Sequence, residues 1–360
     1  METISVSAAS KTYPVFIGKN IIESLPDFIV KQYEKIGKIL IITDEAVAAL
    51  HLPAVKNVLE KTGKTVIEYI TPEGEHAKTF QVFYDTHSYA LSQNLNRNSM
   101  VLALGGGAVG DLAGFVAATF MRGVPFLQIP TTLLAHDSAV GGKVAINHPE
   151  GKNMIGVFYQ PEAVFYDINF LRTLPARELR SGFAEIVKEA LIQDPAFYSW
   201  LLENIKDLQA LSENHLLHMI KKGIEIKAAI VSEDERETGV RAYLNLGHTL
   251  GHAVETMMGY GEFPHGEAVM VGLVYALRLS MKECSLDFDM EKFTGWVQSL
   301  GYNIQIKEDL DCDGLISLMK KDKKSVGSMV TFVLLKEIGA PITTEIADHD
   351  IKDVLRLMYL

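Results

Sequence analysis

The chain has 360 residues, which is long enough for two domains with sizeable hydrophobic cores. Its 48% hydrophobic and 22% charged residues are typical of a globular protein, and its formal net charge of -11 argues against nucleic acid or an anionic membrane as the main partner. The two cysteines, Cys284 and Cys312, are too few for a disulfide framework or a cysteine-rich zinc site.

The first half of the chain alternates strand-like and helix-like segments. Short apolar runs predict the strands, and longer amphipathic runs between them predict the helices. The predicted strands are 38–43, 65–70, 100–104 and 126–129, and the predicted helices are 45–61, 78–94 and a segment that starts at Asp111. Alternation of helices with near-continuous apolar strands predicts an α/β domain with a mainly parallel, Rossmann-like sheet that is covered on both faces.

Helical patterns dominate after about residue 175. The predicted helices are 177–192, 215–233, 248–258, 266–282 and 290–299, and strand character returns only at 329–335. We therefore expect an α/β domain at 1–175 and a mostly α-helical domain at 176–360. Because active sites often lie in the cleft between two such domains, we expect the active site there.

No targeting or membrane segment is predicted. The first residues lack both the basic region and the apolar core of a signal peptide. The best apolar run, 268–277, is far shorter than the roughly 20 residues that a membrane helix needs. We expect a cytoplasmic enzyme.

A glycine-rich turn stands between a predicted strand and a predicted helix. Residues 105–111, Gly-Gly-Gly-Ala-Val-Gly-Asp, satisfy the pattern G-x-G-x-x-G, in which the backbone approaches a pyrophosphate at a helix N-terminus. The usual acidic residue about twenty positions on is absent, and Asp44 is the candidate for a ribose contact. A turn that serves only tight packing is the alternative. We favour nucleotide binding, because 72–75 also follows a strand.

Basic residues recur in loops that are rich in glycine and polar residues. Gly-Gly-Lys at 141–143 and Gly-Lys-Asn at 151–153 can place an ammonium beside a phosphate, and Arg122 and 322–324 have similar surroundings. A single lysine is usually a solvated surface residue. The recurrence predicts a doubly anionic substrate.

Three of the eleven histidines lie between His248 and His265. His248 and His252 share one face of a helix, and His265 follows a turn marked by glycine and proline. A catalytic zinc site needs three protein ligands and an open position, and Glu185 is a candidate third ligand. Alternatively, Glu185 is not a ligand and only forms an intrahelical ion pair with Lys188. The helical spacing favours His248 with His252, but it leaves open which two histidines bind.

Together these motifs resemble the 3-dehydroquinate synthase family. The matching segments cover most of residues 38–335 in the family's order. They are Gly-Gly-Gly-Ala-Val-Gly-Asp (105–111), Pro-Thr-Thr-Leu-Leu (130–134), Gly-Gly-Lys (141–143), Gly-Lys-Asn-Met-Ile-Gly (151–156), Gly-Phe-Ala-Glu-Ile-Val-Lys (182–188), Leu-Asn-Leu-Gly-His-Thr-Leu-Gly-His-Ala-Val-Glu (244–255) and His-Gly-Glu (265–267). Between Ala135 and Asp137 this chain has one residue, His136, where the commoner family form has two.

The resemblance implies the site residues. It implies a divalent metal, zinc or alternatively cobalt, held by Glu185, His248 and His265, in place of the pair favoured by helical spacing. The implied catalytic residues are Asp137, Lys188, Asn245 and His252. The implied substrate contacts are Arg122, Lys143, Asn153, Lys227, Arg241, Lys323 and Lys324. The implied NAD contacts are Asp44, Glu73, Gly74, Glu75, His76, Ala77, Lys78, Gly107, Ala108, Val109, Gly110, Asp111, Thr131, Thr132, Lys143, Lys152, Phe170, Leu171, Arg172 and Thr173. Arg122 is similar to an arginine that reaches across a dimer interface, which implies a homodimer.

The resemblance also implies the reaction. In this family 3-deoxy-D-arabino-heptulosonate 7-phosphate becomes 3-dehydroquinate and phosphate, the second step of the shikimate pathway to the aromatic amino acids. NAD oxidises the C5 alcohol, phosphate leaves by β-elimination, the hydride returns, the ring opens and an intramolecular aldol step closes the carbocycle. NAD is therefore regenerated in each turnover.

Three other functions are compatible with the motifs. A metal- and NAD-dependent polyol dehydrogenase would use a similar plan, but it would release NADH at each turnover and would not need the lysine-rich anion site. Another sugar-phosphate cyclase would use the same scaffold on a different substrate. An NAD-sensing binding protein would hold a structural metal in a closed site with four ligands.

Overall fold

The computed structural model describes residues 1–259, 263–306, 311–322 and 329–359. These residues form two compact units: the first is Met1–Pro175 with Leu216–Arg236, and the second is Ala176–His215 with Glu237–Leu360. The sequence-based division at residue 175 assigns 216–236 to the second domain, whereas these residues belong to the first unit.

Side chains of residues 216–236 explain why this segment joins the first unit. Most of the segment is helix α8 (Glu213–Glu233), and the Nζ of its Lys227 lies 3.1 Å from the Oδ2 of Asp137. Just after α8, the Glu235 carboxylate accepts hydrogen bonds from the Ser10 backbone N–H at 2.8 Å and from Gln160 Nε2 at 2.8 Å. The segment is therefore tied to the first unit by charged groups.

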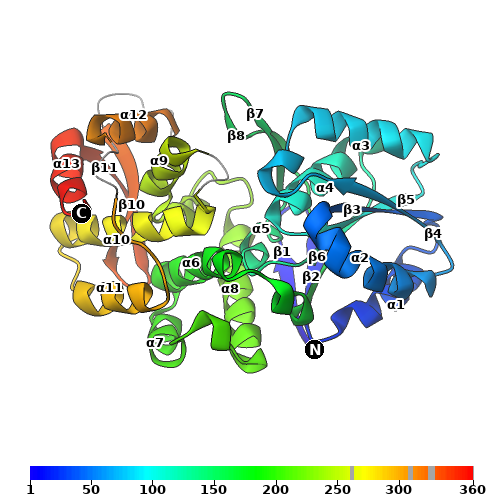
Figure 1. Cartoon of the computed structure of the whole chain (residues 1–360), viewed down its shortest axis with the longest axis horizontal. Helices are drawn as coiled ribbons and strands as arrows, with labels where there is room; N and C mark the ends of the chain where they lie inside the picture. The colour runs from blue at the N-terminus through cyan, green and yellow to red at the C-terminus, as the bar shows by residue number, and fades with distance from the viewer. Residues whose placement is uncertain (260–262, 307–310, 323–328, 360) are drawn as a thin grey trace. The chain divides into compact units, whose positions relative to one another are not determined.

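The first unit is built on a seven-stranded sheet in the order β1-β2-β9-β6-β5-β3-β4 (Figure 1). β1 pairs antiparallel with β2, and the other neighbouring strands are parallel. The strands are β1 (Glu2–Ser7), β2 (Thr12–Gly18), β3 (Lys38–Asp44), β4 (Thr65–Thr71), β5 (Ser99–Gly105), β6 (Phe126–Pro130) and β9 (Ala163–Asp167). The predicted mainly parallel, Rossmann-like sheet is confirmed, and β1, β2 and β9 are additional strands.

Helices cover both faces of this sheet. Along β3, Ile39 and Ile41 belong to the core under α1 (Leu25–Gln32) and α2 (Glu45–Glu60). The alternate residues Leu40 and Ile42 belong to the core under α3 (Phe80–Ser92) and α4 (Gly107–Thr119) on the other side (Figure 1). The period of two residues follows from the geometry of a strand that is buried on both faces. The unit also contains the short helix α5 (Ala135–Ser138) and an antiparallel hairpin of β7 (Lys143–His148) and β8 (Gly151–Phe158).

The second unit is mostly helical, as predicted. Its helices are α6 (Ala176–Gln193), α7 (Pro195–Asn204), α9 (His248–Met258), α10 (His265–Cys284), α11 (Met290–Ser299), α12 (Cys312–Asp322) and α13 (Asp348–Arg356). The predicted helices 248–258 and 290–299 match α9 and α11 residue for residue. One antiparallel pair, β10 (Met329–Glu337) and β11 (Ala340–Ala347), completes the described part. No helix among the described residues is long and apolar enough to cross a membrane.

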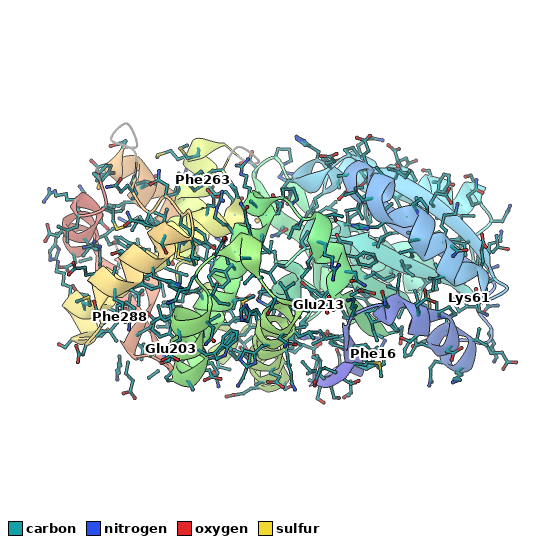
Figure 2. The ribbon with its side chains drawn as sticks, turned by 60° about the horizontal axis from the view of Figure 1, so that its bottom comes forward. Phe16, Lys61, Glu203, Glu213, Phe263 and Phe288 are labelled. Carbon is teal, nitrogen blue, oxygen red and sulfur yellow. The ribbon has the colours of Figure 1, made fainter. Side chains whose placement is uncertain are left out.

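Aromatic side chains pack against one another in each core, and Figure 2 labels two of them, Phe16 and Phe288. In the first unit the Phe16 ring lies 5.0 Å from that of Phe165. In the second unit the Phe288 ring lies 5.6 Å from Phe293 and 6.0 Å from Tyr198. Burial of such large rings supplies much of the hydrophobic stabilisation of a core.

Helix α10 packs against α6 and α9 at two glycines. A Cβ added at Gly272 would lie 1.8 Å from the backbone oxygen of Gly247, just before α9. A Cβ added at Gly266 would lie 2.0 Å from the backbone oxygen of Ser181 on α6. Both distances are too short for any side chain, so the glycines allow the three helices to approach one another at the level of the backbone.

We predict that Gly272→Ala lowers the free energy of unfolding by about 1–3 kcal/mol, because the added methyl group must push α10 away from α9. Urea denaturation measures the change. Gly295→Ala on α11 is the matched control, since a Cβ there meets nothing within 4 Å. This control should gain about 0.5–1 kcal/mol from the better helix propensity of alanine. Equal stability of the two variants would show that the close approach is not required.

Candidate active site

The predicted NAD contacts of the first unit gather at one edge of its sheet. Because β3, β4, β5, β6 and β9 are parallel, the residues that follow them lie at their shared carboxyl edge. The chain runs from β3 to β4 in one direction and continues from β5 on the other side of β3, so the strand order reverses at β3 and β5. A reversal of this kind is where nucleotides bind in open α/β sheets.

The glycine-rich turn serves both packing and helix initiation. Helix α4 begins at Gly107, earlier than the predicted start at Asp111, so the second half of the motif is the first turn of the helix. The backbone N–H groups of a first helical turn lack intrahelical partners and favour an anion. A Cβ at Gly110 would lie 2.8 Å from Gln128 Oε1, so close packing also requires glycine there.

A polar network joins predicted NAD contacts to a predicted substrate contact. The buried Nζ of Lys78 lies 2.6 Å from Asp111 Oδ2 and also contacts Asn153 Oδ1. Asn147 donates a hydrogen bond of 2.7 Å to Glu75 Oε2 and accepts one of 2.9 Å from the Asn153 backbone N–H. The network therefore brings the segment after β4, helix α4 and the β7–β8 hairpin together.

One acid and one histidine at this edge have roles that the sequence pattern did not indicate. Asp44 Oδ1 accepts a 2.8 Å hydrogen bond from the Val47 N–H and thereby caps helix α2, and burial raises the pKa of the Asp44 carboxyl. His51, which sequence analysis did not single out, places its Nε2 2.9 Å from the Thr173 hydroxyl and its ring 4.6 Å from that of Phe170. His51 thus holds the predicted NAD segment 170–173.

The predicted substrate cations of the first unit differ in their surroundings. Lys227 pairs with Asp137 at 3.1 Å and donates a hydrogen bond to its backbone oxygen, so a predicted substrate contact meets a predicted catalytic residue. Lys143 is exposed at the start of β7, and Arg122 has a left-handed backbone with φ of 68°. The predicted contacts Lys323 and Lys324 lie outside the described residues.

The second unit brings together Glu185, His248 and His265, the ligand set that the resemblance implies. Glu185 lies on α6, and the two histidines are the first residues of α9 and α10. The Nε2 atoms of His248 and His265 lie 3.4 Å and 3.3 Å from Glu185 Oε1. Zinc bonds of about 2.0–2.1 Å in a tetrahedron give ligand-to-ligand distances of about 3.3–3.4 Å. The donor set and its spacing therefore fit a zinc-like ion.

The other ring nitrogen of each histidine has its own acceptor. His248 Nδ1 lies 3.3 Å from the backbone oxygen of Leu246, and His265 Nδ1 lies 3.2 Å from Glu255 Oε2. A proton on each Nδ1 leaves the Nε2 lone pair directed toward the metal position.

The charges of the site suit metal binding. Burial alone would raise the pKa of Glu185, but the Lys188 ammonium, which contacts Oε2, and the two histidines hold it well below its usual range. Burial lowers the pKa of His248 to about 4. Burial would also lower the pKa of His265, but hydrogen bonds to Glu185 and Glu255 raise it to about 9. A metal would therefore meet an ionised carboxylate and a neutral His248, and it would displace a proton from His265.

His252 lies beside the group of Glu185, His248 and His265 but outside it, so the geometry favours His265 over the partner that helical spacing favoured. Its ring lies 5.2 Å from that of His248 at an interplanar angle of 87°, and 5.8 Å from that of His265. Four residues of helix place two rings on one face without directing their nitrogens at one point. The start of α10 supplies the second imidazole instead.

Two predicted polar residues precede α9 in the 3-10 helix η6 (Val240–Asn245). Arg241 is 1% exposed, and Asn245 donates a 3.0 Å hydrogen bond to Glu237 Oε1. Sequence analysis singled out neither Glu237 nor Glu255. The only available signal for Glu255 was its position on the same face of the predicted helix as His248 and His252.

Comparison with known sequences identifies the family. Residues 68–181 match the profile of the 3-dehydroquinate synthase N-terminal region, and residues 182–325 match that of the C-terminal region. A 3-dehydroquinate synthase of Geobacillus thermodenitrificans is 51% identical over 345 residues, which cover 96% of this chain and 94% of that protein. One of Bacillus mycoides is 48% identical over 351 residues, which cover 98% and 97%. This chain belongs to the 3-dehydroquinate synthase family.

Solved structures of related cyclases share the fold of this 3-dehydroquinate synthase family member. A 2-deoxy-scyllo-inosose synthase, complexed with carbaglucose-6-phosphate, NAD+ and Co2+, superposes with a TM-score of 0.90 at 26% identity. The superposition covers 99% of this chain and 100% of that one. The expected fold of the family is therefore confirmed.

We predict that His265→Ala abolishes retention of zinc, because the site loses one of three ligands. His252→Ala is the matched control: it removes a neighbouring imidazole that lies outside the ligand set, so zinc should be retained. Metal analysis after dialysis measures both. Retention by His265→Ala together with loss by His252→Ala would restore the pair favoured by helical spacing.

Proposed function

We propose that this chain is a 3-dehydroquinate synthase, which converts 3-deoxy-D-arabino-heptulosonate 7-phosphate into 3-dehydroquinate and phosphate with catalytic NAD and a divalent metal. The observation that carries the proposal is the group of Glu185, His248 and His265, whose spacing fits a zinc-like ion, in a chain of this family. Zinc suits the ligand set, and cobalt suits it as well.

The residues of the second unit prepare the oxidation of an alcohol. When bound, the metal lowers the pKa of a coordinated hydroxyl group and NAD accepts the hydride. Lys188 keeps Glu185 ionised, so the carboxylate stays available as a ligand. His252, with Asn245 nearby in the sequence, stands beside the ligand set and takes the hydroxyl proton away. General acid–base help of this kind contributes roughly 10²–10⁴-fold.

Cations hold the two anionic ends of the substrate. Lys143 and Asn153 of the hairpin bind the phosphate, together with Arg122, Lys323 and Lys324. Lys227 and Arg241 bind the carboxylate, and Asp137 keeps Lys227 in place through their ion pair. Fixing both ends orients a flexible intermediate for elimination and ring closure.

The reaction uses residues of both units. In this proposal the first unit is the NAD-binding domain, with the dinucleotide along the carboxyl edge of its sheet and its pyrophosphate at the start of α4. The second unit is the metal-binding domain, and residues of both units bind the substrate. Each supplies a part that the other lacks, because among the described residues the candidate metal group lies wholly in the second unit.

We further propose that the enzyme is a homodimer and works in the cytoplasm. β8 exposes four large apolar side chains, two on each face of the strand: Met154 and Phe158 are 61% and 43% exposed, and Ile155 and Val157 are 38% and 42% exposed. Apolar groups clustered in this way favour a protein interface. Both cysteines are free thiols, which suits a reducing compartment.

The end of β8 lies close to the segment that carries the arginine that would reach a partner. Tyr159, the next residue after β8, donates a 3.0 Å hydrogen bond to the backbone oxygen of Val124. A Cβ at Gly123 would lie 3.2 Å from the same hydroxyl. Arg122 precedes Gly123, so an interface on β8 would extend to it.

We predict phosphate release from the heptulosonate phosphate with catalytic NAD and added zinc, without stoichiometric NADH, because the hydride returns in each turnover. A coupled assay measures the released phosphate, and the absorbance near 340 nm measures NADH. Lys143→Ala should lower kcat/KM strongly, since it removes a cation beside the departing phosphate. Accumulation of NADH in step with turnover would support a polyol dehydrogenase instead.

We predict a native mass of twice 39.8 kDa, and a monomer for Val157→Lys, because a buried unpaired charge in an interface is costly. Light scattering measures the mass. Leu50→Lys is the control, since Leu50 is 56% exposed on α2, on the opposite face of the sheet from α3 and α4. If both variants keep the mass of the unmodified protein, β8 is not the interface.

A further inference from the structure

We infer that Glu255 is a positioning residue for the metal: its buried carboxylate accepts the Nδ1 proton of His265 and thereby fixes that imidazole as a ligand. The inference rests on the proposed function, because it concerns the metal site of that function. Its test separates the failure of one from the failure of the other.

The Glu255 carboxylate is buried and contacts a candidate metal ligand. The side chain is 3% exposed, on α9, and its Oε2 lies 3.2 Å from His265 Nδ1. A carboxylate buried to this extent is costly unless it is paired. His265 provides an N–H donor whose ring then presents its other nitrogen to Glu185. The contact with His265 is therefore one of the interactions that offset the burial of the Glu255 carboxylate.

The two histidine ligands differ in how they are held. His248 has its Nδ1 acceptor in the backbone oxygen of Leu246, two residues earlier, so its ring is oriented locally. His265 has a carboxylate from another helix as its acceptor. Its side chain is also more exposed, at 31% against 12% for His248, so surrounding atoms restrain it less. An outside partner is accordingly more important for His265.

The backbone at the start of α10 is anchored separately from the imidazole. The Gly266 N–H donates a 3.0 Å hydrogen bond to the Ser181 hydroxyl of α6. The next residue, Glu267, accepts hydrogen bonds of 3.1 Å and 2.8 Å from Nε and Nη2 of Arg180. These contacts fix where the His265 backbone lies, but they leave its side-chain torsions free. Glu255 holds the ring at Nδ1, in addition to the contact that Glu185 makes at Nε2.

The carboxylate also acts on the strength of the ligand. A histidine that donates to an anion is a more basic ligand than one that donates to a neutral carbonyl. Glu255 lies seven residues after His248 and on the same face of α9. One helix thus contributes a ligand at its start and the support of a second ligand two turns later.

We predict that Glu255→Ala weakens zinc binding by about 10–100-fold, the usual cost of removing a partner of a metal-bound histidine. Glu255→Gln should lose less, because its amide oxygen still accepts a hydrogen bond but carries no charge. Competition with a chelator of known affinity measures the dissociation constant. The absorption spectrum of the cobalt-loaded protein reports the ligand geometry, which a role in folding alone would leave unchanged.

Glu283→Gln is the matched control. Glu283 lies on α10 in the same unit, pairs weakly with Lys282 at 4.0 Å and is remote in sequence from the ligands. The substitution makes the same change of charge, so zinc affinity should stay as in the unmodified protein. Urea denaturation of the metal-free variants identifies any that fail to fold, and Glu255→Gln, which keeps the shape of the side chain, then carries the test.

Two negative results have different meanings. If folded Glu255→Gln and Glu255→Ala bind zinc as tightly as the unmodified protein and give the same cobalt spectrum, the inference is overturned while the proposed function stands. If the unmodified protein binds neither metal, and His265→Ala behaves identically, the proposed function is overturned and the inference with it.

Discussion

The close approach of α6, α9 and α10 is the constraint on which the candidate metal site depends. Glu185, His248 and His265 come from these three helices. The Oε1 atom of Glu185 lies 3.3 Å from the Nε2 atom of His265 and 3.4 Å from that of His248. The carboxylate and the two imidazoles meet at one point because the helices that carry them pack closely together. Gly266 and Gly272 permit that contact, since a Cβ at either would overlap a backbone oxygen. The ligand geometry is thus a consequence of helix packing.

In the first unit, the feature that matters for ligand binding is the placement of charged side chains. The chain as a whole is acidic, yet Lys143, Lys152 and Arg122 lie on the hairpin or in turns of a unit whose strands end at one edge. Lys78 is kept there by Asp111 although it is almost fully buried. A local excess of positive charge attracts an anionic ligand regardless of the net charge of the molecule. In the proposed function, the distribution of charge, and not its total, therefore accounts for the binding of an anionic substrate.

Most of the fold followed from patterns that are local in sequence. The apolar runs of β3 to β6 and the helical periodicity of α9 and α11 place these elements, because a strand and a helix bury different residues. The metal ligands were harder to predict from patterns that are local in sequence. Helical spacing favoured His252, and only the resemblance to a family indicated His265. Glu255 and the membership of α8 in the first unit escaped both approaches, since each depends on a contact between residues far apart in the chain.

The return of the chain to the first unit has a consequence for synthesis. Residues 1–175 leave the ribosome first and contain every strand of the large sheet. Three of these residues have ion-pair or hydrogen-bond partners that are synthesised later. Glu2 pairs with Lys221 at 2.8 Å, Asp137 with Lys227 at 3.1 Å, and Ser10 with Glu235. All three contacts can therefore be present only after residue 235 has emerged. A fragment cut at residue 175 would carry an incomplete complement of ion pairs.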